Sequence, residues 1–141
     1  MAEGSISVID RFYEVWFARD VAAILDLMSP VVRMTQHFED PAVPFAGTGV
    51  GKAALEARLD GIFSAWRFLH IEPRHFQSDG VNIRTNCTFE VQHIATGEVF
   101  DGTLRHFWVV RDGLITQLDE HLDVARFKAF LRLLGLPSDA T

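Results

Sequence analysis

The sequence lacks the features that mark several large classes of protein. Its single cysteine, Cys87, cannot form a disulfide within the chain, as is typical of a reducing cytoplasm. No apolar run approaches the ~18 residues of a membrane helix. The N-terminal stretch MAEGSISVID also lacks the basic region and apolar run of a signal peptide. These absences predict a cytoplasmic protein that does not enter membranes.

Positive charge is scarce as well. Lys and Arg number 13 against 19 Asp and Glu, and the formal net charge is −6. Because the two signs are interspersed and no basic stripe is present, we expect neither nucleic acid nor a membrane as a partner. The six histidines show no zinc-motif spacing. We therefore expect no metal and no cofactor.

Apolar residues, by contrast, are abundant. They make up 48% of the 141 residues and include twelve Phe and three Trp. A chain of this length is expected to form one domain, 1–141, and to bury roughly 68–70% of its unfolded surface. That is enough for a core and for a ligand-sized cavity.

The N-terminal half is predicted to be mainly helical, because apolar residues recur there at helical spacing. The expected elements are a helix at 5–18, a short helix capped by Asp20 that runs through Met28, a strand at 31–38, a loop at 39–51 and a helix at 52–66. Pro30 is expected to end the short helix. The loop is expected from its two prolines and three glycines.

In the C-terminal half, the apolar residues recur at every second position instead. Residues 81–93 alternate almost without interruption, which is typical of a strand with one buried face. The face expected to be buried consists of Val81, Ile83, Thr85, Cys87, Phe89, Val91 and His93. Turn signals flank this strand at 79–80 and 96–97. Arg111-Asp112-Gly113 then predicts a three-residue turn between the last two strands.

Asp123 is expected to cap a final helix that stops near Gly135 and Pro137. Helices followed by antiparallel strands indicate an α+β fold with the helices on one face of the sheet. At ~3.3 Å per residue, the strand 81–93 would span about 43 Å, so the sheet must curl. We therefore expect a cone-shaped α+β barrel, in which a curved antiparallel sheet holds the N-terminal helices inside its concave face.

Three stretches carry a resemblance to a known family: RFYEVWFARDVAAILDLMSPVV, PFAGTGVGKAAL and HFWVVRDGLITQLDEHLDVARF. Together they resemble the nuclear transport factor 2-like superfamily, in particular its SnoaL-like and ketosteroid-isomerase-like members, over roughly residues 5–135. The resemblance implies a cone-shaped pocket and a homodimer formed through the outer face of the sheet. It specifies function poorly, since this fold hosts isomerases, cyclases, hydrolases and catalytically silent binders.

Two enzyme groups of the superfamily match poorly at their catalytic positions. In ketosteroid isomerase, the first-helix tyrosine, the base aspartate and the second oxyanion-hole acid fall on Phe12, Gln36 and His106. A phenylalanine cannot donate a hydrogen bond and a glutamine cannot act as a base. In limonene epoxide hydrolase, the arginine and the two aspartates fall on Cys87, Phe89 and Glu120. Neither mechanism is therefore expected, whereas Glu120 is a tolerable stand-in for the pocket carboxylate of SnoaL-like cyclases.

Two ionisable side chains, His106 and Glu120, lie where the alternation of the last two strands points inward. The expected turn sets His106 opposite Leu118, with Glu120 one pair further along. Diagonal neighbours of this kind have Cβ atoms roughly 7 Å apart, close enough to meet directly or through water. A coupled acid and base in an apolar cavity suits proton transfer near neutral pH. Glu120, assisted by His106, is the predicted catalytic pair.

The predicted ligand is a small hydrophobic molecule, with Gln36 orienting one of its carbonyl or hydroxyl groups. The predicted walls of its pocket are Phe12, Trp16, Met34, Phe63, Phe89 and Trp108. Three functions remain open: a cofactor-independent isomerase, cyclase, lyase or hydrolase; a non-catalytic carrier or sensor; and an interaction module with a filled interior. His106 and Glu120 can also be no more than a satisfied polar pair in the core.

Overall fold

The computed structural model describes residues 2–136, apart from the side chains of residues 2, 3, 75 and 76. Its helices and strands, in chain order, are α1 (Ala2–Phe17), α2 (Val21–Asp26), β1 (Met28–Gln36), β2 (Gly47–Val50), α3 (Lys52–Ala65), β3 (Trp66–Ser78), β4 (Asn82–His93), β5 (Val99–Arg111), β6 (Leu114–His121) and α4 (Val124–Leu133). Among the described residues, no helix has the length and apolar character needed to cross a membrane.

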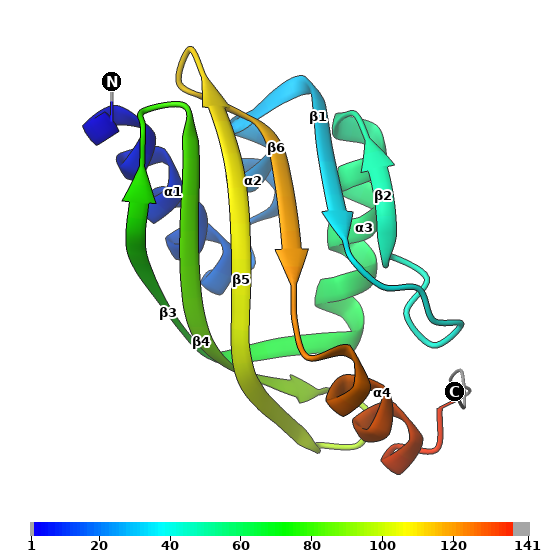
Figure 1. Cartoon of the computed structure of the whole chain (residues 1–141). Coiled ribbons are helices and arrows are strands. Elements are labelled where there is room, and N and C mark those ends of the chain that lie inside the picture. The colour runs from blue at the N-terminus through cyan, green and yellow to red at the C-terminus, as the bar shows by residue number, and fades with distance from the viewer. Residues whose placement is uncertain (1, 137–141) are drawn as a thin grey trace.

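The strands form one sheet in the order β2-β1-β6-β5-β4-β3. All neighbouring strands are antiparallel except β1 and β6, which run parallel. The sheet curves around α1, α2 and α3, and α4 packs across one end (Figure 1). The predicted α+β fold with a curved sheet around N-terminal helices is confirmed.

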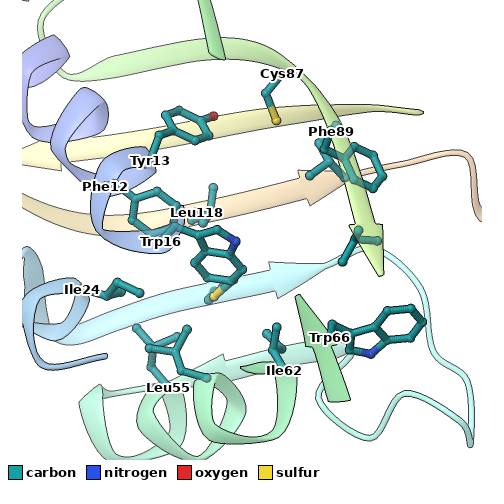
Figure 2. Close-up of a cluster of buried hydrophobic side chains, with 14 of the residues drawn as sticks. Phe12, Tyr13, Trp16, Ile24, Leu55, Ile62, Trp66, Cys87, Phe89 and Leu118 are labelled. Atoms are coloured by element: carbon teal, nitrogen blue, oxygen red, sulfur yellow. The ribbon is translucent and has the colours of Figure 1, made fainter. Parts of the chain in front are cut away.

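The core lies between the concave face of the sheet and the helices. The α1 residues Phe12, Tyr13 and Trp16 are at most 7% exposed and project between the strands and α3 (Figure 2). Trp16 packs edge-on against Phe63 of α3, with ring centroids 5.0 Å apart. Each such side chain contributes roughly 1.5–3 kcal/mol through burial, so the aromatic stripe of α1 anchors the helix inside the sheet.

The predicted alternation of β4 is confirmed. Six of the seven residues expected to face inward are buried, and Val81 is half-buried before the strand begins. The prediction for the last helix also holds in the described residues. The Asp123 carboxylate accepts a hydrogen bond from the Arg126 backbone N–H, and Gly135 has the positive φ of +77° that ends the helix. Pro137 lies outside the described residues.

Three local predictions were wrong. The short second helix ends at Asp26 rather than Met28, and β1 spans 28–36 rather than 31–38, with Pro30 inside it. The pairing of β1 with β6 is irregular between Met28 and Arg33, so Pro30 breaks no regular ladder there. The glycine-rich loop contains the short strand β2, which pairs with Arg33–Gln36.

Strand β3 was not predicted at all. It runs through Pro73, which pairs with Cys87, and it pairs irregularly with β4 at two other points. Because β3 is the edge of the sheet, Pro73 removes no backbone hydrogen bond that a second neighbour requires. Polar and apolar residues do not alternate regularly in its sequence, so the alternation pattern did not predict this strand.

The β5–β6 hairpin has a tighter turn than predicted. Asp112 and Gly113 form a two-residue turn, and both have positive φ, +52° and +76°. A bulge then leaves Thr116 unpaired, because Val109 pairs with Gln117 and Val110 with Ile115. Together these differences shift the register by two residues.

Candidate functional site

The shifted register brings the predicted catalytic pair together. His106 on β5 lies directly opposite Glu120 on β6, rather than opposite Leu118 as predicted. Gln36, at the end of β1, is the neighbour of Glu120 in the parallel pair. His106 Nε2 lies 3.1 Å from Glu120 Oε1, and Gln36 Nε2 donates to Glu120 Oε2 at 2.6 Å. Both carboxylate oxygens therefore accept a hydrogen bond from a neighbouring strand.

The environment of Glu120 sets its charge. Its side chain is 12% exposed and that of His106 only 4%. Burial by itself raises the pKa of Glu120. The hydrogen bond and charge of His106, the Gln36 amide and the more distant Arg58 charge outweigh burial and leave that pKa below its ordinary value. Glu120 is thus a carboxylate at neutral pH, and His106 Nε2 carries the proton between them.

A hydrogen-bonded chain continues behind His106. The Tyr13 hydroxyl lies 2.6 Å from His106 Nδ1 and 2.8 Å from Thr85 Oγ1, and Trp108 Nε1 donates to Thr85 Oγ1 at 2.9 Å. Burial raises the pKa of Tyr13, so this phenol keeps its proton. Trp108 donates to Thr85 and His106 donates to Glu120, while the Tyr13 hydroxyl lies between Thr85 and His106 and bonds to both. The chain ends on the carboxylate.

Tyr13 was missed as a site residue. The sequence placed it on the apolar stripe of α1 beside Phe12, and nothing in the one-dimensional pattern separates a core tyrosine from one that touches a histidine. It is, however, the only tyrosine in the chain. A buried tyrosine needs a hydrogen-bond partner, so this lone phenol was the one available signal.

A cavity of about 70 Å³ lies beside Glu120 and Gln36, which both line it. A water needs about 10–15 Å³ by this measure, so the space holds roughly five waters, and it opens to solvent on one side. All other lining residues are apolar, from helices, strands and the 37–46 loop. Its phenylalanines are Phe38, Phe45, Phe68, Phe89, Phe100 and Phe127. One carboxylate and one amide therefore line an otherwise apolar space.

Most of the predicted wall residues lie at this space. Trp16 and Phe89 line the main cavity, while Phe12 and Met34 line a smaller hollow of about 10 Å³ further in, with His106 and Glu120. The other two lie behind these walls. Phe63 packs against Trp16, and Trp108 packs edge-on against Phe12 with ring centroids 4.9 Å apart. They support the walls rather than face the space.

The mouth of the cavity was also missed. Phe38, Val43 and Phe45 come from the 37–46 loop, and Phe127 comes from α4. The Arg58 guanidinium holds this loop by donating to the carbonyls of Phe45 and Gly47 and to that of Met34. Phe38 and Phe127 meet edge-on at 5.6 Å. Such contacts join segments far apart in the sequence, and periodicity does not report them.

Two polar atoms of cavity-lining residues lack a hydrogen-bond partner among the described residues. They are the indole nitrogen Nε1 of Trp16 and the amide oxygen Oε1 of Gln36, both with almost no exposed surface.

Cys87 is not a candidate site residue. Burial, followed by the negative charge of Glu120, raises the pKa of its thiol to about 12, so it is an inert core residue. Within the described residues, no three His, Cys, Asp or Glu side chains are placed to hold a metal ion.

The curved sheet around the helices and the polar group at the inner end of its cavity define a nuclear transport factor 2-like α+β cone. The SnoaL-like domain family matches residues 9–118. The chain belongs to this family. No curated protein sequence matches it significantly.

Solved structures of the same fold are numerous. A putative isomerase from Rhodopseudomonas palustris is similar with a TM-score of 0.81 and 16% identity, over 91% of this chain and 96% of that one. TerC, co-crystallised with polyporic acid, is similar with a TM-score of 0.76 and 24% identity, over 92% of this chain and 98% of that one. A putative polyketide cyclase from Xanthomonas campestris pv. campestris has a TM-score of 0.75 and 16% identity, and the match covers 91% of this chain and 96% of that one. At these identities the likeness shows the fold alone.

Proposed function

We propose that this protein binds a small, largely apolar molecule in its cavity and that Glu120, assisted by His106, moves a proton on that molecule. One observation carries the proposal: a buried carboxylate lines an otherwise apolar cavity and is held by a histidine and an amide. Burying an ion costs several kcal/mol even when it is paired. A core that needed only stability has no use for this cost beside an open space.

The reaction that this arrangement supports begins with Glu120 as a base. The carboxylate takes a proton from a carbon or oxygen next to a ligand carbonyl, and it returns the proton to another atom of the same molecule. The protein then ends in the state in which it began. His106, held by Tyr13, keeps the carboxylate in place throughout. This scheme covers isomerisation, cyclisation and elimination without a cofactor.

The comparisons support the ligand class without assigning it. TerC was co-crystallised with polyporic acid, and other structures of the fold carry the names of a putative polyketide cyclase and a putative isomerase. A cavity with phenylalanine walls suits ring-shaped molecules in this chain too. The cytoplasmic location and the homodimer through the outer sheet face also remain predictions.

A non-catalytic carrier is the second candidate, and the charge of Glu120 favours it. A group that exchanges protons best has a pKa near the working pH, whereas the pKa of Glu120 is shifted downward. In a carrier, the carboxylate would only accept a hydrogen bond from the ligand.

Proton exchange separates the two functions without knowledge of the natural substrate. A ring ketone, 2-tetralone, is incubated with the protein in D₂O, and loss of its α-protons is followed by NMR. We expect the protein to accelerate exchange and Glu120→Gln to reduce the acceleration about 100-fold or more, as for loss of a general base. Asp119→Asn, one residue away on the outer face, is the matched control and should exchange like the wild type. Binding of 2-tetralone without faster exchange would leave the carrier as the function.

A further inference from the structure

The two unpartnered polar atoms at the cavity differ in kind. Trp16 Nε1 can only donate a hydrogen bond, and Gln36 Oε1 can only accept one. Trp16 is 7% exposed, and Figure 2 shows its indole nitrogen turned away from α1 toward the interior. Buried polar groups of folded proteins nearly always find partners, and leaving one unpaired is costly. A donor and an acceptor both without partners at one cavity therefore need an explanation.

The orientation of the Gln36 amide follows from its neighbour. Glu120 is a carboxylate and only accepts hydrogen bonds, so the amide must turn its NH₂ group toward Glu120 Oε2, where the distance is 2.6 Å. The opposite end, Oε1, is then the end left without a partner. An oxygen in this position cannot bind a carbonyl. It selects a hydroxyl or an N–H group on the ligand.

The orientation of Trp16 is fixed by packing instead. Its ring stacks on Phe12 at 5.5 Å and meets Phe63 and Phe68 edge-on at 5.0 and 5.7 Å. With three aromatic neighbours the indole cannot rotate freely, so its N–H is a preorganised donor. Trp66 also lines the cavity, but its indole nitrogen is not among the unpartnered buried atoms. The two tryptophans therefore have different roles.

We infer that Trp16 Nε1 and Gln36 Oε1 are specificity-determining groups, and that the ligand is a ring compound bearing both a hydrogen-bond acceptor, such as a ketone oxygen, and a donor, such as a hydroxyl. The inference rests on the proposed function, since it names the chemical class of the molecule in the same cavity. A cyclic hydroxyketone meets both requirements. Its apolar remainder would contact the phenylalanine walls.

Three probes that share one bicyclic skeleton test each group separately. Tetralin has neither group, 2-tetralone has only the acceptor, and 5,6,7,8-tetrahydro-2-naphthol supplies the donor. Dissociation constants are measured by calorimetry for the wild type, Trp16→Phe, Gln36→Met and the control Trp66→Phe. We expect 2-tetralone and the naphthol each to bind the wild type about fivefold more tightly than tetralin, the usual net effect of one hydrogen bond.

The variants should remove these preferences one at a time. Trp16→Phe should abolish the preference for 2-tetralone over tetralin and keep that for the naphthol, while Gln36→Met should do the reverse. Trp66→Phe should keep both, although it too changes the bulk of the wall. Equal binding of all three probes to the wild type, or preferences that survive both substitutions, would overturn the inference while leaving the binding function intact. Failure of every probe to bind, tetralin included, would overturn both.

Discussion

The same chemical arrangement occurs on the two faces of one strand of this protein. On the cavity face, Glu120 accepts hydrogen bonds from His106 and Gln36. On the outer face, its neighbour Asp119 accepts hydrogen bonds from His37 at 2.9 Å and from Gln117 at 2.7 Å. Each carboxylate thus has one histidine and one amide. Alternation along the strand separates the two sets by a single residue.

The two sets differ in their surroundings. The inner histidine and carboxylate are 4% and 12% exposed, against 41% and 21% for the outer pair. Water can replace any lost hydrogen-bond partner of the outer pair. The His37 ring also stacks on the His121 ring, with centroids 4.1 Å apart. Water cannot reach the inner pair in the same way, and its carboxylate faces apolar side chains. The comparison shows that residue type and distance alone do not distinguish a buried pair at a cavity from a surface pair; burial and the surrounding side chains do.

The largest contrast is expected from removing each histidine. His106→Leu removes one of the two hydrogen-bond partners of both Glu120 and Tyr13, and it should lower the free energy of unfolding by about 3 kcal/mol because the buried carboxylate loses its histidine. His37→Leu should lower it by less than about 1 kcal/mol. Urea unfolding measures both. Similar losses in the two variants would show that the inner pair is no more critical than the outer one.

A smaller effect is expected from Tyr13→Phe. The variant keeps the ring but removes the hydroxyl that joins His106 to Thr85, which should cost about 1–2 kcal/mol of stability. Thr48→Val is a suitable control, because it removes an exposed hydroxyl that bonds Thr35, and it should cost less than about 0.5 kcal/mol. Thermal or urea unfolding measures both variants. An equal cost would mean that the hydrogen-bonded chain adds nothing to the buried pair.

The smallest expected effect is a pH dependence specific to the inner carboxylate. The folded-state pKa of Glu120 lies below its ordinary value of 4.5, so in acid the unfolded chain binds this proton first. The stabilisation is therefore complete above about pH 4.5 and is lost as the pH falls through the folded-state pKa. The stability difference between wild type and Glu120→Gln should shrink in urea titrations between pH 6 and pH 3.5. A stability difference for Glu120→Gln that stays constant over this range would contradict the shifted pKa.

The sequence predicted which way the residues of the site face but not how they pair. Alternation is a local property, and it placed His106, Trp108 and Glu120 on the inner face correctly. Register depends on the turn and on bulges. Asp112-Gly113 is itself a signal for a two-residue turn, but the prediction included Arg111 and gave a three-residue turn. The bulge at Thr116 leaves no clear local signal, and His106 was therefore set opposite Leu118.

The fold was predictable because long periodic segments and the family resemblance agreed on it. The missed parts are those held by distant contacts. Strand β3 is stabilised by its ladder to β4 rather than by its own alternation, and β2 is held by β1 and by Arg58. For the same reason Tyr13, the cavity mouth and the free ends of Trp16 and Gln36 emerged only from the three-dimensional arrangement.

The parallel pairing of β1 with β6 has a consequence for how the molecule matures. Gln36 and Glu120 touch across 84 positions of the chain, so a ribosome must synthesise nearly the whole protein before the two can meet. Contacts of such long range form late and slow folding. A nascent or C-terminally truncated chain that ends before β6 lacks the carboxylate of the cavity and two of its wall residues, Leu122 and Phe127, so the complete site exists only once the last strand has docked.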